Sequence, residues 1–325
     1  MTQDLKPVTV TAPVNIAVIK YWGKRDETLI LPTNPSLSVT LDTLVSRTSV
    51  EPSPSGKDCL LLNGSQSDLT PRIAAVLKAI RAHAPAESAL PAGLASSASG
   101  LAALAFALAE FYAIDVSRET LSGIARLGSG SACRSVFGGF VEWEAGKLAD
   151  GSDSLARQVA PASHWPEMAA VICVVSDRKK ETSSTAGMQT SVATSELMAT
   201  RIRDCVPKRI EDIKKAILEK DFETFAEITM RESNQFHAIC LDTWPPIFYL
   251  TDVSKQIMQM VHAYNKEKGS TRLAYTFDAG PNAVIYSPYP DALEDITQMV
   301  SSRFSEQEVS KILRSGIGHG PEIIG

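Results

Sequence analysis

The chain has 325 residues, of which 44% are hydrophobic, and a formal net charge of −5. This length and composition predict a core large enough for two lobes, whereas the negative charge argues against a general nucleic-acid-binding protein, which is normally basic. An anionic ligand would have to be held by locally concentrated cations, and the candidates are Lys20, Lys24, Arg72 and Arg134.

In the first half of the chain, β-branched or alternating residues predict strands at 8–10, 36–41, 47–50 and 59–62. Apolar residues at helical spacing predict helices at 70–83, 100–112 and 117–127, followed by a strand at 137–143. The first half is therefore expected to be mixed α and β.

The second half repeats this mixture. An apolar strand is expected at 169–175, and helices at 191–205, 207–218, 222–236 and 247–266, punctuated by Pro207, Pro245 and Pro246. Strands at 273–277 and 283–286 and helices at 292–304 and 306–313 complete the prediction. The boundary between the halves is predicted near residue 165.

Cysteine and histidine usage predicts no disulfide framework and no metal site. The five cysteines, at 59, 133, 173, 205 and 240, are widely spaced and lack a CxxC pair. The histidines lack the spacing of metal ligands. No apolar stretch is long enough to cross a bilayer, and the first residues lack the order of a secretory signal, which predicts a cytoplasmic protein without a membrane partner.

The segment PAGLASSASG at residues 91–100 runs directly into an apolar, alanine-rich stretch. Small residues let the backbone approach an anion, the serines add hydroxyl donors, and the N–H groups of a helix start favour negative charge. The segment therefore predicts a phosphate loop that caps a helix, although no Walker lysine follows. A plain Gly/Ser turn before a buried helix is the alternative.

An apolar run at residues 14–24 ends in Lys20, Tyr21, Trp22, Gly23 and Lys24, which predicts a strand that delivers cations to a cleft. The alternative is that the lysines are solvated strand ends and the aromatic residues fill the core.

Residues 126–135 combine small residues and hydroxyls with Arg134, and a guanidinium suits bidentate binding of phosphate or carboxylate. Cys133 is interpreted as a small buried neighbour and not as a nucleophile, because no partnered histidine is indicated. Asp278 follows a β-type run beside a turn, and by itself this segment would be an ordinary Asp-Ala-Gly-Pro turn.

Taken together, these four segments resemble the mevalonate diphosphate decarboxylases, a branch of the superfamily named for galactokinase, homoserine kinase, mevalonate kinase and phosphomevalonate kinase. IKYWGK, GLASSASG, GSGSACRS and FDAGPN occur in that family's order at residues 19–24, 93–100, 128–135 and 277–282. Similar stretches at 34–38, 138–143, 183–188 and 318–321 extend the resemblance over nearly the whole chain. The chain departs from the family pattern after Leu41 and at residues 86–92, where the strand that precedes the phosphate loop is hard to find.

The resemblance implies a two-lobed α+β fold with the active cleft between the lobes. Residues 1–165 would form a ribosomal-protein-S5-like half with the ATP phosphate loop, and residues 166–325 a ferredoxin-like half with the catalytic Asp278. Similar enzymes are usually homodimers, so a homodimer is expected.

The activity that the resemblance implies is ATP-dependent decarboxylation of mevalonate 5-diphosphate to isopentenyl diphosphate, with Mg²⁺ bridging the phosphate oxygens. Asp278, Lys20 and Arg134 are the expected catalytic residues, with Lys20 paired to Asp278 and Arg134 beside Ser131 on the substrate carboxylate. The substrate would be bound by Tyr21, Trp22, Gly23, Lys24, Arg72, Ser129, Gly130, Ser131, Ala132, Cys133, Arg134 and Thr185. The ATP phosphates would be bound by Gly93, Leu94, Ala95, Ser96, Ser97, Ala98 and Ser99.

Three other functions fit parts of the pattern. A kinase of the same superfamily would phosphorylate a mevalonate-like hydroxyl and stop there, a non-catalytic sensor would bind nucleotide without turnover, and a scaffold protein would use neither. The elements around Lys20 and Arg134 favour the decarboxylase over the kinase. A scaffold would leave four polar motifs without an explanation.

Overall fold

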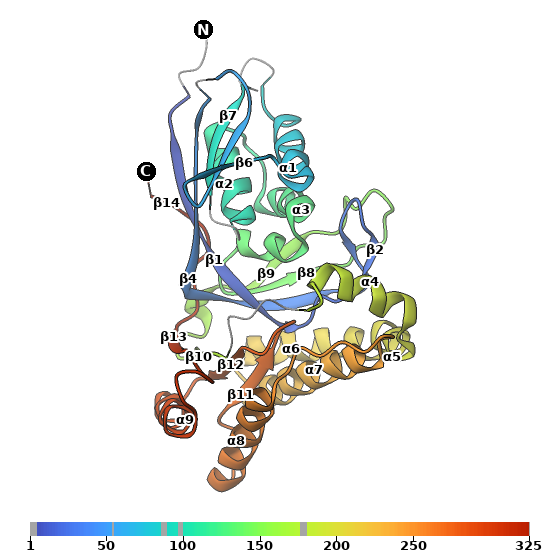
Figure 1. Cartoon of the computed structure of the whole chain (residues 1–325), viewed down its shortest axis with the longest axis vertical. Coiled ribbons are helices and arrows are strands. Elements are labelled where there is room, and N and C mark those ends of the chain that lie inside the picture. Colours follow the sequence, from blue (N-terminus) through green and yellow to red (C-terminus); the bar gives the residue numbers. More distant parts are fainter. Residues whose placement is uncertain (1–4, 54, 86–89, 97–99, 176–180, 325) are drawn as a thin grey trace.

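Two β-sheets, each accompanied by helices, organise the chain into the upper and lower parts of Figure 1. The structure is a computed structural model, and it describes residues 5–53, 55–85, 90–96, 100–175 and 181–324. The upper part contains the first half of the chain, and the lower part contains most of the second half.

The first sheet has eight strands. Its main path runs β14 (Glu322–Ile323), β1 (Val8–Ile19), β4 (Ser36–Pro52), β7 (Ala92–Ser96), β5 (Cys59–Leu62) and β6 (Ser65–Ser67). β8 (Phe140–Trp143) pairs with β4, and β9 (Ala156–Ala160) pairs with β8. Two short strands, β2 (Lys24–Asp26) and β3 (Leu31–Pro32), form a separate hairpin.

Helices α1 (Pro71–Arg81), α2 (Leu101–Phe111) and α3 (Arg118–Gly128) pack together beside this sheet, and a 3₁₀ helix, η1 (Gly130–Val136), follows them. Within α2 only Leu101 and Glu110 are not buried. The alanine-rich composition of α2 therefore makes a central helix that contacts β1, β4, α1 and α3.

The second sheet is antiparallel, with the order β11 (Ala274–Phe277), β12 (Ala283–Ser287), β10 (Ala169–Val174) and β13 (Lys311–Ser315). Its helices are α4 (Ser184–Thr194), α5 (Glu196–Thr200), α6 (Val206–Glu219), α7 (Phe222–Asp242), α8 (Asp252–Lys268) and α9 (Pro290–Arg303). A 3₁₀ turn, η2 (Ala162–His164), precedes the sheet, and a π-helical turn, η3 (Arg201–Cys205), joins α5 to α6.

One hydrophobic core joins the two parts. Val18, Ile19 and Leu37 from the first sheet belong to the same buried cluster as Phe225 of α7 and Phe277 of β11. β14 then returns the end of the chain to the first sheet, where Ile323 lies opposite Val10. None of the helices in the described ranges is long and apolar enough to cross a membrane.

The predicted α+β architecture is confirmed, and several predicted element bounds are wrong. The separate strands at 36–41 and 47–50 are one strand, β4, because pairing with β1 continues through the polar residues between them. The helix at 191–205 is divided at Ser195, whose backbone is extended, and α8 begins at the capping box of Thr251 and not at residue 247.

The helix predicted at 306–313 is also wrong. Residues of this region form the edge strand β13, in which Leu313 lies opposite Ile172 of β10. Strands β2, β3, β6, β9 and β14 were not predicted, because strands of two to five residues give little local pattern.

Candidate active site

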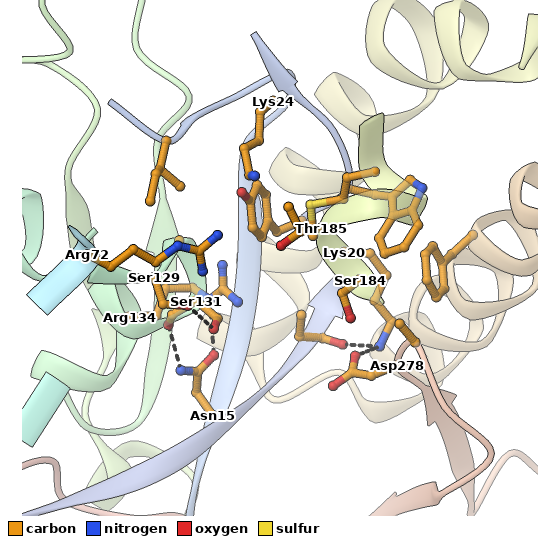
Figure 2. Close-up of a pocket in the computed structure, with 18 residues that line it drawn as sticks. Asn15, Lys20, Lys24, Arg72, Ser129, Ser131, Arg134, Ser184, Thr185 and Asp278 are labelled. Carbon is orange, nitrogen blue, oxygen red and sulfur yellow. Dashed lines mark hydrogen bonds and ion pairs between the residues drawn. The ribbon is translucent and has the colours of Figure 1, made fainter. Parts of the chain in front are cut away.

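A cavity of about 410 Å³ lies where the two parts of the chain meet (Figure 2). Asn15, Arg72, Ser129, Ser131 and Arg134 line one side, and residues of the second half line the other. The lining residues are Asn15, Ala17, Lys20, Tyr21, Trp22, Lys24, Ile30, Arg72, Ser129, Gly130, Ser131, Arg134, Ser184, Thr185, Met188, Phe236, Asp278 and Ala279.

The four cations singled out by the sequence all line this cavity. Lys20 and Lys24 follow the end of β1, Arg72 lies in the first turn of α1, and Arg134 lies in η1. Among the lining residues that the structure describes, Asp278 is the one carboxylate. The prediction that these cations converge is therefore confirmed, and their charge suits a ligand with several negative charges.

Lys20 and Asp278 form an ion pair at the centre of the site, as predicted. Lys20 Nζ lies 2.7 Å from Asp278 Oδ1 and donates a second hydrogen bond to the Ala17 carbonyl, also at 2.7 Å. The lysine side chain is 3% exposed, whereas the aspartate side chain is 51% exposed and faces the cavity. Burial lowers the pKa of Lys20 below its ordinary value, and the neighbouring Asp278 opposes this shift.

Arg134 is buried, and its hydrogen bonds end on neutral oxygens. Its Nε donates to Asn15 Oδ1 at 3.2 Å and to Ser38 Oγ at 3.0 Å, and its Nη1 donates to Ser36 Oγ at 2.5 Å. Nη2 takes part in none of these bonds. Burial lowers the pKa of the guanidinium, but an arginine keeps its charge at physiological pH, so the site contains a desolvated cation suited to an anion.

The first turn of α4 brings Ser184 and Thr185 to the opposite wall (Figure 2). Ser183 caps this helix by accepting a hydrogen bond from the Ala186 N–H at 3.2 Å. A helix N-terminus favours a negatively charged ligand, and two hydroxyls add donors. Thr185 was predicted from the sequence, whereas Ser184 and Asn15 were missed, although Ser184 lies directly beside Thr185.

Tyr21, Trp22, Gly130, Ser129 and Ser131 also lie at the cavity as predicted. The ring of Tyr21 packs edge-on against Trp143, with centroids 4.7 Å apart, and a Cβ on Gly130 would lie 2.7 Å from the Tyr21 ring. Glycine is required there because no side chain would fit. Trp22 is only 2% exposed, and its indole N–H donates to Ser191 Oγ at 2.9 Å, so its side chain belongs to the buried core that supports this wall of the cavity.

Three of the predicted substrate residues do not line this cavity. Gly23 has a φ of +93°, a left-handed conformation that favours glycine, and so it shapes the turn between β1 and β2. Ala132 and Cys133 are buried in η1. The Cys133 thiol donates to the Gly130 carbonyl at 2.9 Å, and burial raises its pKa to about 12, so this thiol is poorly suited to act as a nucleophile.

The phosphate loop is where the structure differs most from the sequence-based prediction. Gly93, Leu94, Ala95 and Ser96 lie in strand β7, between β4 and β5, and not in a loop. Gly93 and Leu94 are buried, and Ser96 Oγ lies 2.7 Å from Thr48 Oγ1 of β4. The predicted residues Ser97, Ala98 and Ser99 lie outside the described residues.

The physical reason follows from the short segment at residues 86–92. The sheet has a place between β4 and β5 that no earlier strand among the described residues fills, and residues that the sequence assigned to the loop pair there. The prediction of a loop is therefore wrong for residues 93–96, which lie in strand β7.

A second cavity of about 350 Å³ adjoins the first and shares Asn15, Arg72, Ser129 and Ser131 with it. Leu101 and Ala102, at the start of α2, form another part of its wall. Gly100, at the N-cap of α2, has no side chain that could cap the helix, and a helix N-terminus favours an anion. Within the described ranges, no group of three or more His, Cys, Asp or Glu could hold a metal ion.

Two family models match the chain in succession. Residues 12–156 match the diphosphomevalonate decarboxylase-like N-terminal domain, and residues 170–317 match the mevalonate 5-diphosphate decarboxylase C-terminal domain. A curated relative, the diphosphomevalonate decarboxylase of Candida albicans, is 50% identical over 354 aligned positions, which cover 97% of each chain. Since 354 positions exceed the 325 residues present here, the relative has residues without a counterpart in this chain.

Solved structures agree with the family models. A crystal structure of mevalonate 5-diphosphate decarboxylase is similar with a TM-score of 0.88 and 43% identity, covering 98% of this chain and 97% of that one. A structure described as MDDEF in complex with MVAPP, AMPPCP and magnesium is similar with a TM-score of 0.84 and 33% identity, covering 98% of both chains.

Proposed function

The chain belongs to the diphosphomevalonate decarboxylase family, and we infer from this premise how the residues of its cleft carry out the reaction. The enzyme converts mevalonate 5-diphosphate and ATP to isopentenyl diphosphate, ADP, phosphate and carbon dioxide, a step of isoprenoid and sterol precursor synthesis by the mevalonate pathway. The observation that supports our assignment of roles is that Lys20, Lys24, Arg72 and Arg134 line the same cavity as the Asp278 carboxylate.

The reaction requires that a poor leaving group be made a good one. A tertiary hydroxyl leaves poorly, so it is first phosphorylated by ATP. Departure of that phosphate builds positive character at the adjacent carbon, and loss of the carboxylate supplies the electron pair that forms the double bond. The protein must therefore hold the diphosphate, fix the carboxylate and orient the hydroxyl toward the γ-phosphate.

Asp278 is assigned as the catalytic carboxylate that accepts or orients the proton of the tertiary hydroxyl. Its exposed oxygen faces the cavity while the other is held by Lys20 at 2.7 Å. An ammonium at this distance stabilises the ionised carboxylate. Lys20 is thus assigned as the residue that fixes both the charge and the direction of Asp278.

Arg134 is assigned to the substrate carboxylate, with Ser131 beside it. A buried guanidinium that is held by Asn15, Ser36 and Ser38 is oriented before the ligand arrives, which lowers the entropic cost of binding. As the carboxylate is lost, the same charge stabilises the electron-rich transition state.

The diphosphate is assigned to the remaining cations and donors. Lys24, Arg72, Tyr21 and Ser129 line the first-half side of the cavity, and Thr185 lies at the N-terminus of α4. Lys24 Nζ lies 2.6 Å from Glu27 Oε2, and the lysine side chain is only 4% exposed, so its ammonium is oriented by Glu27 and little screened by solvent. Ser184 adds a hydroxyl that the sequence did not predict.

We assign the ATP phosphates to the second cavity, where Arg72 and the start of α2 lie together. The related structure with AMPPCP and magnesium supports binding of ATP and Mg²⁺. The Arg72 guanidinium and the helix N-terminus fit phosphates. A bound Mg²⁺ ion would neutralise part of the negative charge of the ATP phosphates.

Three properties of the whole protein are proposed from the sequence and from similar enzymes: a homodimer, a cytoplasmic location, and a domain boundary near residue 165. A boundary there would fall between β9 of the first sheet and β10, the first strand of the second sheet, with β14 returning to the first sheet at the end of the chain. Analytical ultracentrifugation of the purified chain tests the homodimer, since a monomer mass at all concentrations would contradict it.

The assignment of roles is tested by following ADP and carbon dioxide together with purified enzyme, ATP, Mg²⁺ and mevalonate 5-diphosphate. We expect equal release from the wild type, whereas ADP alone would indicate a kinase. Asp278→Asn keeps the size of the side chain and removes its charge, so we expect both products to fall by about 10²- to 10⁴-fold. Substrate binding should persist.

The matched control is Asp252→Asn, which removes the same charge from an exposed ion pair with Lys255 on α8. It should leave both rates unchanged. ADP formation without carbon dioxide in Asp278→Asn would place this residue after phosphorylation, and unchanged activity would remove it from catalysis.

A further inference from the structure

Lys20 leaves the first sheet immediately before the cleft, and side chains hold its main chain in place of a strand partner. The last paired residue of β1 is Ile19, which lies opposite Leu37. The Lys20 N–H donates to Glu232 Oε1 at 3.0 Å. The Lys20 carbonyl accepts from Arg201 Nη2 at 3.0 Å and from Asn34 Nδ2 at 3.1 Å.

The Glu232 and Arg201 side chains are both 0% exposed and form an ion pair with each other. Arg209 contacts the other oxygen of Glu232, with Nη1 2.7 Å from Oε2, and its own side chain is 20% exposed. Desolvation of a buried pair costs about as much as its attraction returns, so full burial is weak evidence for a role in stability alone. The hydrogen bonds that Glu232 and Arg201 make to the Lys20 main chain indicate a different role for this ion pair, in the active site.

The backbone conformation around Arg201 also supports a functional role for the Glu232–Arg201 pair. Arg201 opens η3, a π-helical turn between α5 and α6. Such turns are rare and are frequently found at functional sites. Here Arg201 faces inward, whereas the side chains of Arg203 and Asp204 in the same turn are 72% and 49% exposed.

We propose that Glu232 and Arg201 are positioning residues of this active site, which hold both main-chain polar groups of Lys20 and thereby set where its ammonium meets Asp278. Neither residue lines the cavity, so neither is expected to touch substrate. The proposal rests on the function assigned above, because it concerns the residue that orients the catalytic carboxylate.

The consequence for catalysis follows from the short distances at Lys20. Its Nζ lies 2.7 Å from Asp278 and 2.7 Å from the Ala17 carbonyl, so a shift of the Lys20 backbone moves the ammonium and the carboxylate together. A displacement of about 1 Å at a reacting group costs about 10²-fold in rate. Substrate affinity depends on other residues and should change much less.

The test compares Glu232→Gln and Arg201→Lys with Arg209→Gln as the matched control. Arg209 belongs to the same buried cluster but makes no hydrogen bond to Lys20 in the described structure. We expect kcat to fall by about 10- to 100-fold in the first two variants, with KM for both substrates within about threefold. Arg209→Gln should keep kcat within about threefold of the wild type.

A pH profile separates positioning from a general loss of structure. The groups that face the Lys20 ammonium are Asp278 after β11, Glu232 and His237 on α7, and Arg134 in η1. Because the Glu232 charge raises the pKa of Lys20, its removal should move the alkaline limb of kcat to lower pH, by about half a unit to one unit. Arg209→Gln should not move this limb.

Three results would overturn the proposal: unchanged kcat in both variants, equal losses in the control, or, in Glu232→Gln, an alkaline limb of kcat that stays at the wild-type pH. If Glu232→Gln fails to fold, Arg201→Lys and Glu232→Asp provide the comparison of kcat with the control. Both keep the buried charge and alter the reach to Lys20, so in these two variants kcat should fall while the alkaline limb stays in place. Wild-type turnover in the same assay tests the assigned function separately, because its absence would contradict that function and not the positioning.

Discussion

Arg134 is a buried cation whose known partners are neutral. Its fork geometry is held by Asn15, Ser36 and Ser38, and a lysine ammonium cannot make the same set of bonds. We therefore expect Arg134→Lys to lower kcat by about 10²-fold while KM for ATP changes less than about twofold. Steady-state kinetics with each substrate varied in turn measures both.

The matched control for Arg134 is Arg157→Lys, which changes an exposed arginine that is paired with Glu144. It should leave turnover unaltered. Wild-type turnover in Arg134→Lys would remove this residue from the site.

The buried His237 on α7 interacts electrostatically with Lys20 and Asp278. From it we predict how the free energy of unfolding depends on pH. Burial, together with the Lys20 charge, lowers the pKa of His237 to about 3, whereas an unfolded histidine has a pKa of about 6.5. The unfolded state therefore binds the extra proton, and stability falls as pH drops below about 6.5, by about 1.4 kcal/mol per unit.

Urea unfolding at pH 6.5 and pH 5 measures this effect. The wild type should lose about 2 kcal/mol more than His237→Asn over this range, because the variant has no histidine to protonate. The comparison concerns the change with pH, so any constant loss of stability in the variant cancels. An identical pH dependence of the two proteins would show that His237 is protonated in the folded state.

Among elements, β7 gives the most specific prediction. Ser96 is the residue of the predicted phosphate loop whose hydroxyl position the structure describes, and it contacts Thr48 of β4 at 2.7 Å. The Ser96 hydroxyl thus forms a hydrogen bond between two strands of the first sheet. We expect Ser96→Ala to lower the free energy of unfolding by about 1 kcal/mol and to leave KM for ATP within about twofold of the wild type.

Thr48→Val is the matched change on the partner strand, and it should cause a similar loss. Thr48 Oγ1 also donates to the Gly100 carbonyl at 3.3 Å, so Thr48→Val removes that bond as well. In the double variant the loss should be smaller than the sum of the two single losses, because both single variants remove the same Ser96–Thr48 hydrogen bond. A rise in KM for ATP confined to Ser96→Ala would instead place this hydroxyl at the nucleotide.

The helix predicted near the C-terminus shows why short elements are difficult to assign. Residues 306–313 contain apolar positions that fit a helix, yet β13 (Lys311–Ser315) pairs with β10 at the edge of the second sheet. The vacant edge of β10 offers a ladder of backbone hydrogen bonds, and this tertiary pairing outweighs a weak local preference.

At the scale of the whole molecule, net charge and local charge have opposite signs. The chain carries a net charge of −5, but its cleft collects Lys20, Lys24, Arg72 and Arg134. Salt screens such attraction, with a Debye length of about 10 Å at 0.1 M. We expect KM for mevalonate 5-diphosphate to rise by about three- to tenfold between 0.05 M and 0.5 M KCl, with kcat changing less than twofold.

Lys24→Gln should flatten this dependence, because it removes one cation from the cavity. Lys215→Gln removes the same charge from an exposed position on α6, where Lys215 pairs with Glu219 at 3.9 Å, and it should leave the dependence intact. Equal slopes in all three proteins would contradict a role for the cleft cations in attracting substrate.

The sequence by itself determined the α+β class and most of the residues that line the cleft, and its resemblance to a known family implied the reaction. These properties could be predicted because they depend on residue types in local order: small residues with hydroxyls, lysines after an apolar run, and an aspartate at a strand end. The helix α7 was predicted because apolar periodicity over many residues is a strong signal, and α2 was predicted from its continuous apolar, alanine-rich run.

Only the tertiary structure decided which groups meet. Lys20 and Asp278 are 258 positions apart in the chain, and Lys20 and Glu232 are 212 apart, so no local pattern relates them. The same holds for residues 93–96, which enter the sheet because a place between β4 and β5 is open to them. Backbone groups pair with whatever strand or side chain the fold brings near, because leaving them buried and unpaired costs free energy, and that cost depends on the whole fold.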